Sequence, residues 1–151
     1  MESTLVAPRA GFYSRVLALH TAHPRQFVDI TDDIRSCIEQ SSLLNGLAVI
    51  ASRHTTAAIV INEHEPELLK DLDRMLVELA PPDRQYAHNG VPCGKGEQPN
   101  GHSHCQALLL TCSASLPIFD GMPVLGRYQR IFLVELDGPR HREVTVALLG
   151  T

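Results

Sequence analysis

Histidine is the main chemical resource of this 151-residue chain, which contains eight of them. Two stand one residue apart in the stretch NGHSHCQALLL, where His102 and His104 precede an apolar run. In an extended segment, residues i and i+2 point to one side, so both rings would face the same ion or substrate. In a helix the two rings lie about 200° apart, and only one of them would face a site. The backbone state of this segment therefore decides whether the two histidines act together.

Three histidines from distant segments form a candidate metal site. His54 stands beside two threonines at the break between two apolar stretches, and His88 and His104 flank a stretch rich in proline and glycine. Neutral imidazole is a common metal ligand, and three such ligands leave one position open for water or substrate. Spacing alone does not bring the rings together, so a structural role for each histidine stays open.

Other charged residues suggest acid or anion chemistry less directly. Asp71 lies near the apolar stripe of a predicted helix, where it is either functional or a solvated carboxylate paired with Lys70 or Arg74. Arginine grips phosphate with two parallel hydrogen bonds, which makes four residues near the C-terminus candidate anion anchors: Arg127, Arg130, Arg140 and Arg142. No phosphate-binding glycine motif is present, and the stretch GKGEQPNG is interpreted as a solvated loop.

The pattern of apolar residues predicts six strands and two helices. Strands are expected at residues 13–19, 27–30, 46–52, 57–63, 130–137 and 143–150. Helices are expected from an N-cap at Thr31 and from Pro66 to Ala80, where Pro81-Pro82 ends the second one. Residues 81–103 read as an ordered site loop, residues 105–119 as strand or helix, and Asp120-Gly121 as a hairpin turn.

This order of elements indicates a single α+β domain over residues 1–151. Two short helices cannot separate every pair of strands, so most of the sheet must be antiparallel. We expect a mostly antiparallel β-sheet sandwich with two to three helices packed on it.

The composition limits the classes of partner. The net charge of −4 does not favour nucleic acid or anionic lipid, and no apolar stretch is long enough to span a membrane. The first residues lack the pattern of a signal peptide, so we expect a cytoplasmic protein with reduced cysteines. Cys37, Cys105 and Cys112 are predicted to be core side chains, and Cys93 lies in the glycine-proline loop.

An ordered set of short motifs resembles the YjbQ-like family, also called secondary thiamine-phosphate synthases. The motifs are HTTAAIVINE, KDLDRML, Y-x-H-N, SHCQALL, CSASLPI and LGRYQRIFLVELDGPRHR, followed by a final glycine. They extend from about Gly11 to Gly150. The resemblance implies an α+β fold with a large antiparallel component and a homotrimer. It also implies a pocket between subunits that is lined by histidines and acids.

The resemblance carries functional roles to individual positions of this chain. It implies catalytic roles for His54, Glu63, Asp71 and Gln129, and substrate binding by Thr55, Asn62, Ser113, Tyr128 and Arg142. Metal ligands would be His54, His88 and His104, while His102 falls where the family pattern does not require histidine. Tyr128 stands where family members usually carry tryptophan, and Thr111 where they usually carry glycine. Both departures concern the identity of the substrate more than the fold.

The activity implied by the resemblance joins a hydroxymethylpyrimidine diphosphate to a thiazole phosphate and releases pyrophosphate. A divalent ion, zinc on the histidines or magnesium on Glu63 and Asp71, would assist departure of the diphosphate. Two alternatives stay open. One is a trimer that binds a metal or a small anion without efficient catalysis, and the other is an interaction module whose histidines buffer a subunit interface.

Overall fold

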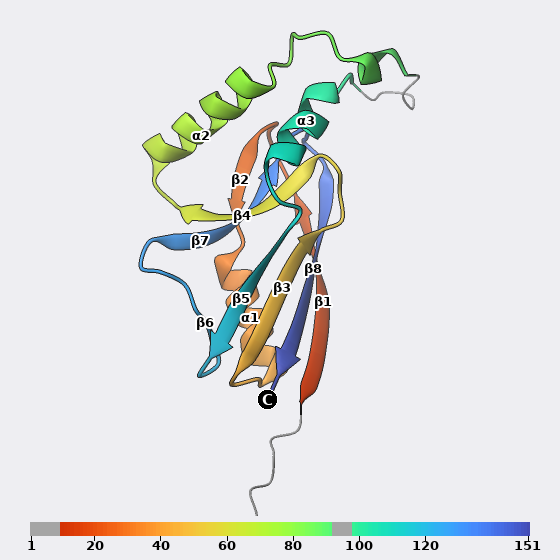
Figure 1. Cartoon of the computed structure of the whole chain (residues 1–151). Helices are drawn as coiled ribbons and strands as arrows, with labels where there is room; N and C mark the ends of the chain where they lie inside the picture. Colours follow the sequence, from red (N-terminus) through yellow and green to blue (C-terminus); the bar gives the residue numbers. More distant parts are fainter. Residues whose placement is uncertain (1–9, 92–97) are drawn as a thin grey trace, which may run out of the picture.

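Two antiparallel sheets and three α-helices build the chain (Figure 1). The computed structural model describes residues 10–91 and 98–151. Sheet A contains, in spatial order, β1 (Gly11–His20), β8 (His141–Gly150), β3 (Gly46–Ser52), β5 (Ser113–Phe119) and β6 (Met122–Pro123). Sheet B contains β2 (Gln26–Asp29), β7 (Gln129–Glu135) and β4 (Ala57–Glu63). The helices are α1 (Thr31–Ser41), α2 (Pro66–Leu79) and α3 (Gly101–Leu109), with a 3₁₀ turn η1 (Ala87–Gly90). The predicted α+β class with antiparallel sheets is confirmed.

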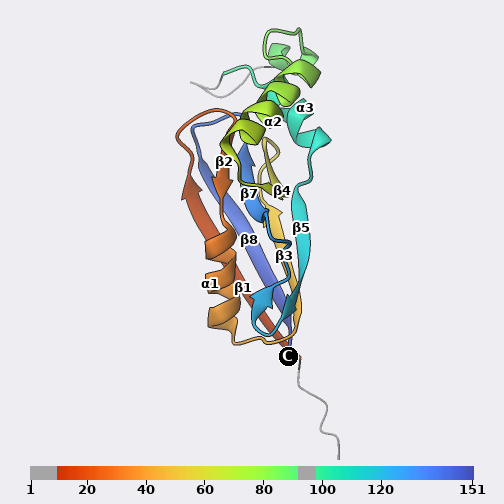
Figure 2. The same cartoon turned by 90° about the vertical axis from the view of Figure 1, so that its left-hand side faces the viewer.

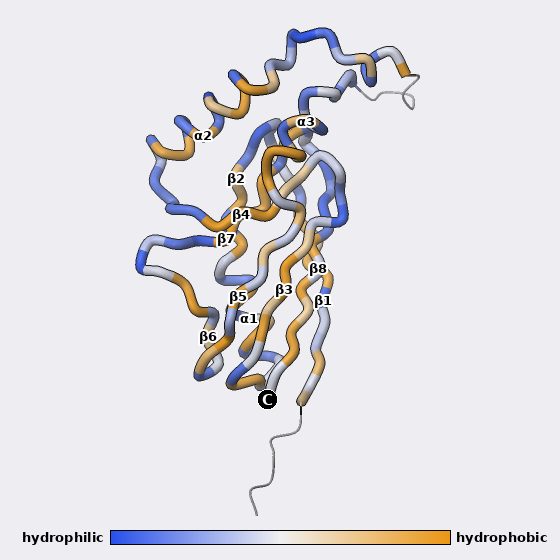
Figure 3. Tube along the Cα trace, in the orientation of Figure 1, coloured by the Kyte–Doolittle hydropathy of each residue, from blue (hydrophilic) through white to orange (hydrophobic). Residues whose placement is uncertain are grey.

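The main core lies between the inner face of sheet A and a second layer made by α1 and sheet B (Figure 2). Ile34 and Ile38 of α1 meet Ile50 of β3 and Leu133 of β7 in one fully buried cluster. The tube coloured by hydropathy shows apolar residues recurring along these strands (Figure 3). This burial of apolar surface is the main force that holds the two sheets together.

A second core covers the other face of sheet B. Phe132 and Val134 of β7 pack with Leu76 of α2 and with Ala107 and Leu110 around the end of α3. Strand β7 is therefore buried on both faces, as is expected of a nearly continuous apolar run. Helix α2 follows β4 in the chain, and α3 precedes β5 (Figure 1).

The outer face of sheet A has no covering layer within the described residues. Phe12 of β1, Leu149 of β8 and Leu47 of β3 are neighbours across the register, and they are 71%, 55% and 43% exposed. Val16 and Val49 continue the apolar surface on neighbouring rows of the same face. A contiguous apolar sheet face of this kind is typical of an interaction surface.

Several predicted boundaries match the structure and others do not. Strands β3 and β4 coincide with their predicted ranges, and Asp120-Gly121 forms the expected turn with φ angles of 48° and 73°. The predicted N-cap at Thr31 is wrong by one residue, because the N-cap is Ile30, which makes no side-chain capping bond, and Thr31 is the first helical residue. The N–H of Thr31 donates to the Asp29 carboxylate. No helix in the described ranges is long and apolar enough to cross a membrane.

The larger correction concerns the segment after the predicted site loop. Helix α3 begins at Gly101, so the loop prediction fails for residues 101–103, and the apolar run after it is helical only to Leu109. The prediction of three core cysteines is right for Cys37, but Cys105 and Cys112 are exposed. Apolar neighbours in sequence misled that prediction, because Cys105 lies on an exposed side of α3 and Cys112 lies in the connection between α3 and β5. Cys93 lies outside the described residues.

Candidate histidine site

A hollow of about 210 Å³ brings two of the predicted histidines together. It opens between the turn that precedes β4 and the end of α3. Its lining residues are His54, Thr55, Ala57, His104, Ala107, Leu108 and Cys112. The hollow therefore combines two imidazoles, a hydroxyl and a thiol with an apolar wall.

The imidazole of His54 is fixed by a backbone contact. Its Nε2 accepts a hydrogen bond of 2.8 Å from the N–H of Glu143. A ring nitrogen that accepts carries no hydrogen, so the neutral ring must carry its hydrogen on Nδ1. Burial lowers the pKa of His54, and the nearby positive charge of Arg142 lowers it further. At neutral pH His54 is thus a neutral hydrogen-bond donor.

A buried ion pair holds the segments on both sides of His54. Arg142 donates from Nε to Glu135 Oε2 over 2.6 Å and from Nη2 to Thr56 Oγ1 over 2.9 Å. Arg142 directly precedes Glu143, which binds the His54 ring, and Thr56 lies two residues after His54. The ion pair therefore positions both the turn that carries His54 and the strand whose N–H orients its ring.

The carboxylate of Glu135 is fully buried and fully partnered. Thr21 Oγ1 donates to it over 3.0 Å, and the backbone N–H groups of Asp137 and Gly138 donate over 2.8 Å and 2.7 Å. Burial raises the pKa of Glu135, but the hydrogen bonds from Arg142 and from the two backbone groups outweigh it and hold the pKa at about 2. Gly138 leaves the necessary room, because a Cβ there would lie 2.8 Å from the carboxyl carbon.

Helix α3 separates the two neighbouring histidines. His104 lies edge-on to His88 of η1, with ring centroids 4.7 Å apart. Burial and the proximity of His88 lower the pKa of His104. His102 instead lies near Tyr86, with ring centroids 6.4 Å apart, and its pKa is lowered by burial. The helical state answers the question raised by the spacing, because only His104 lines the hollow.

Close packing of η1 against the start of α3 places His88 beside His104. Asn89 Oδ1 accepts the N–H of Gly101 over 2.9 Å. A Cβ on Gly101 would lie 2.5 Å from the Cβ of Tyr86, so only glycine permits this approach.

The three histidines do not form a metal site in this arrangement. No three His, Cys, Asp or Glu side chains lie close enough to hold a metal ion within residues 10–91 and 98–151. In addition, a metal on Nδ1 of His54 would require the hydrogen to sit on Nε2, which already accepts the N–H of Glu143. The expected zinc set of His54, His88 and His104 therefore does not fit the donors of one chain.

A second group of predicted residues lies at the opposite end of β4. Asn62 and Glu63 end that strand, and Glu63 is the register partner of Gln129 on β7. At about 3.3 Å per residue, the strand separates Glu63 from the hollow by roughly 20 Å. Tyr128 is exposed at the same end. The structure of one chain thus divides the residues that the resemblance implied into two groups.

The remaining predicted residues have other surroundings. Asp71 accepts Arg74 Nη2 over 2.7 Å on the exposed face of α2, which is its alternative role as a solvated helix carboxylate. Among the described residues, Asp71 belongs to no group of three or more potential metal ligands, and the magnesium pair with Glu63 stays a prediction. Ser113 opens β5 on its exposed side, next to Cys112. Arg142 is 3% exposed and hydrogen-bonded to Glu135, so its guanidinium is not accessible to a substrate in the hollow.

Three of the four candidate anion anchors are already paired inside the chain. Arg130 donates to Asp29 over 2.7 Å, and Arg140 lies 2.7 Å from Asp137. Arg142 is paired with Glu135, so of these four candidates only Arg127 has no carboxylate partner among the described residues, and it lies over the Tyr128 ring. Arginine content in the sequence therefore overstated the positive charge available to substrates.

The sequence did not predict that Glu135, Glu143 and Cys112 belong to the site or to the contacts that support it. Glu135 carried a usable signal, since it is a lone acid within the apolar run RIFLVEL of a strand buried on both faces. A carboxylate at such a position needs a charged partner. Glu143 contributes its backbone N–H to the His54 ring, and Cys112 lines the hollow. No sequence motif marks either role.

The fold and site together define a class of two-sheet α+β proteins with a histidine-lined hollow between a strand turn and a helix. The chain belongs to the UPF0047 protein YjbQ-like family, whose model matches residues 15–151. A UPF0047 protein from Methanothermobacter thermautotrophicus is 39% identical over 138 residues, which cover 91% of this chain and 92% of that protein.

Solved structures support the same assignment. A YbjQ-like protein of unknown function from Sulfolobus solfataricus superimposes with a TM-score of 0.88 and 38% identity, covering 95% of this chain and 100% of the other. A hypothetical protein from Aeropyrum pernix gives a TM-score of 0.85 and 33% identity, covering 92% and 99%.

Replacing Glu135 tests the buried ion pair. A carboxyl pKa that falls from 4.5 to about 2 on folding contributes roughly 3 kcal/mol, present above pH 4.5 and lost as the pH falls toward 2. Glu135→Gln leaves a buried guanidinium unpaired and should cost about 3–5 kcal/mol at pH 7. Urea unfolding should show this deficit shrinking as the pH falls toward 2. The control Glu143→Gln, at a surface pair, should cost less than about 1 kcal/mol. A deficit that does not change with pH would argue against the assigned pKa.

Nitrogen-15 NMR of the histidine rings tests the state of His54. We expect the hydrogen on Nδ1 and a titration midpoint below the ordinary value of 6.5, because burial disfavours the imidazolium. His20, exposed on β1, provides the chemical-shift reference for the position of the ring hydrogen. A His54 ring with its hydrogen on Nε2 would contradict the hydrogen bond from Glu143.

Proposed function

We propose that this chain is a secondary thiamine-phosphate synthase-like enzyme of low activity, acting at the histidine hollow on a small phosphorylated substrate. The observation that carries the proposal is the joint placement of His54 and His104 in one hollow with the Thr55 hydroxyl. The reaction itself follows from the family resemblance, and the geometry supplies groups that suit it.

The reaction needs stabilisation of a leaving group more than it needs a strong base. A bond from the pyrimidine methylene carbon to a diphosphate oxygen breaks, and a bond from the same carbon to the thiazole nitrogen forms. The electron pair of the broken bond leaves with the diphosphate, and the product carries the positive charge on the thiazolium. Fixed hydrogen-bond donors aimed at the leaving oxygen stabilise that transition state.

The residues of the hollow can supply such donors. The Nδ1–H of neutral His54 and the Thr55 hydroxyl are donors, and His104 offers one N–H while neutral. Ala107 and Leu108 give the hollow an apolar side that can contact the ring of a substrate. No protein-held metal enters this account, since the donor set does not fit one; magnesium arrives with the diphosphate substrate in the assay below.

The alternative is a protein that binds small anions at the same donors without efficient catalysis. It uses the same residues, and it differs only in that binding is not followed by bond breaking. The structural observation in its favour is that Arg53 and Arg142, which flank the His54 segment, are already paired with Glu143 and Glu135, so little positive charge is left to stabilise a departing diphosphate.

His54→Ala and His104→Ala test both possibilities. With hydroxymethylpyrimidine diphosphate, thiazole phosphate and magnesium, each variant should lower kcat/KM for thiamine phosphate formation by about 100-fold, the typical cost of one transition-state donor. His20→Ala, an exposed histidine on β1, should leave activity unchanged. Circular dichroism confirms that each variant is folded.

Two results would count against the enzyme. Wild-type protein that binds pyrophosphate in calorimetry without forming product, with binding lost in His54→Ala, would favour the anion-binding alternative. Activity and binding that are unchanged in both histidine variants would remove the hollow as the site.

We also propose the homotrimer that the resemblance implies, and the cytoplasmic location expected from the sequence stays a prediction. The apolar outer face of sheet A supports assembly, because Phe12, Leu47 and Leu149 would otherwise stay in water. Assembly would also allow Asn62, Glu63 and Gln129 of one subunit to approach the hollow of another.

Sedimentation equilibrium tests this assembly. We expect a particle of three 16.6 kDa chains. Val49→Lys on the outer face should dissociate it, because burial of an unpaired charge is costly. The control variant Leu79→Lys changes another exposed apolar residue, on α2 and away from this face, and should leave the trimer intact. A monomeric wild-type protein would contradict the proposal.

A further inference from the structure

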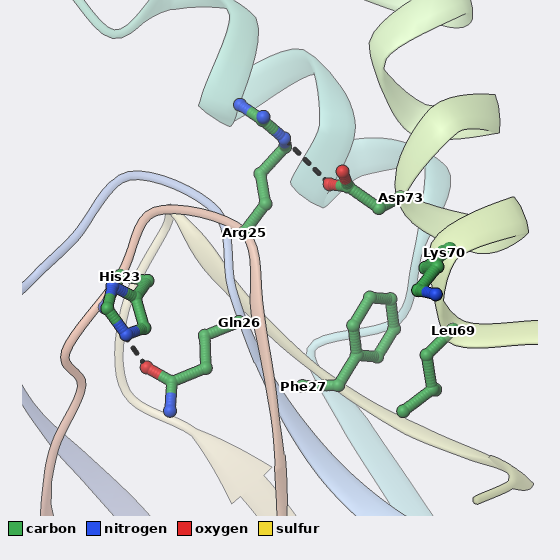
Figure 4. Close-up of a pocket in the computed structure, with 7 residues that line it drawn as sticks. All are labelled: His23, Arg25, Gln26, Phe27, Leu69, Lys70 and Asp73. Carbon is green, nitrogen blue, oxygen red and sulfur yellow. Dashed lines mark hydrogen bonds and ion pairs between the residues drawn. The ribbon is translucent and has the colours of Figure 1, made fainter. Parts of the chain in front are cut away.

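A second hollow, of about 360 Å³, lies on the other side of sheet B from the main core, between the segment joining β1 to β2 and helix α2 (Figure 4). It is lined by His23, Arg25, Gln26, Phe27, Leu69, Lys70 and Asp73. None of these residues lines the histidine hollow. The family resemblance assigns no role to any of them, although Lys70 and Asp73 lie within the KDLDRML motif. Its volume suits a small organic molecule.

The floor of this second hollow is apolar and fixed. Phe27 of β2 packs edge-on against Phe132, with ring centroids 6.1 Å apart and planes at 87°. Leu69 of α2 lies beside it, as the close-up shows (Figure 4). The half-buried ring of Phe27 lines the hollow, so its accessible part can contact a planar apolar group.

The rim presents hydrogen-bond donors in fixed positions. The Oε1 of Gln26 accepts the backbone N–H groups of Ala22 and His23 over 2.7 Å and 3.2 Å, so its amide nitrogen is the part left to donate. Arg25 donates from Nε to Asp73 over 2.7 Å, and its two terminal nitrogens make no hydrogen bond within the described residues. That ion pair also joins the segment to α2 (Figure 4).

The charges at the rim favour an anion. The carboxylate of Asp73 is already matched by Arg25. Lys70 adds a second positive charge; its partner Glu67 is 75% exposed, and such surface pairs are weak enough for the ammonium to turn to a ligand. The groups free to contact a ligand are thus the terminal nitrogens of Arg25, the amide of Gln26 and the ammonium of Lys70.

The backbone at Arg25 adds an independent observation. Its φ of 52° lies in the left-handed region, which side chains with a Cβ rarely adopt. This conformation is part of the turn that aims Arg25 at α2 and Gln26 back at Ala22. Unfavourable backbone conformations of this kind concentrate at ligand-binding segments.

We propose that this second hollow binds a small planar organic anion, such as an aromatic phosphate monoester or carboxylate. The ring stacks on Phe27 and Leu69, and the anionic group accepts hydrogen bonds from Arg25, Gln26 and Lys70. This site is separate from the histidine hollow and does not depend on the proposed activity.

Titration with phenyl phosphate, followed by NMR of the full-length protein, tests the proposal. We expect shifts in the Arg25 Nε–H, the Gln26 side-chain amide and the Phe27 ring. Inorganic phosphate should bind at least 10-fold more weakly than phenyl phosphate because it lacks the ring. Benzyl alcohol should also bind at least 10-fold more weakly because it lacks the charge. Benzoate should bind in place of phenyl phosphate and shift the same signals.

Matched lysine and arginine variants on α2 complete the test. Lys70→Met should weaken phenyl phosphate binding by about 5-fold or more, whereas Arg74→Met, on the exposed face of the same helix, should not change it. Equal effects of the two variants, equal binding of benzyl alcohol, or shifts confined to the histidine hollow would each overturn the proposal. Failure of the thiamine phosphate assay would leave these expectations unchanged.

Discussion

The buried ion pair between Glu135 and Arg142 is the interaction on which the site depends. It joins β7 to β8 of the opposite sheet, and it extends to Thr21 after β1 and to Thr56 before β4. Replacing such a pair by apolar residues is often neutral for stability, so its presence points to positioning more than to strength. Here the position it fixes is that of His54, held between the Thr56 segment and the N–H of Glu143.

This arrangement changes the chemical meaning of the histidines. From the sequence, three imidazoles read as candidate metal ligands. In the structure, His54 is oriented by a backbone donor, and His104 has a second ring against it in place of a shared ion. With its Nε2 occupied by the N–H of Glu143, His54 has an Nδ1–H that suits hydrogen bonding to an oxygen-rich substrate. The carboxylates that would complete an acid–base site lie at the far end of β4, where only a second subunit could bring them near.

The sequence predicted strands, sheet type and the α2 helix well because these depend on local apolar periodicity. It predicted α3 poorly, since GHSHCQALL has a weak amphipathic pattern and its helix is stabilised by tertiary contacts to Tyr86 and Asn89. Of the site, His54, Thr55 and His104 were identified and lie together. Their orientation depends on Glu135, Arg142 and Glu143, which act through packing across two sheets, and no spacing along the chain encodes that convergence.

The most direct measurement is a crystal structure of the protein grown with thiamine phosphate. The account predicts density for the phosphate or the thiazolium within hydrogen-bond distance of the Nδ1 of His54 and close to His104, with the Nε2 of His54 still accepting the N–H of Glu143. Product bound elsewhere, or a His54 ring turned to place Nε2 on a metal ion, would contradict it.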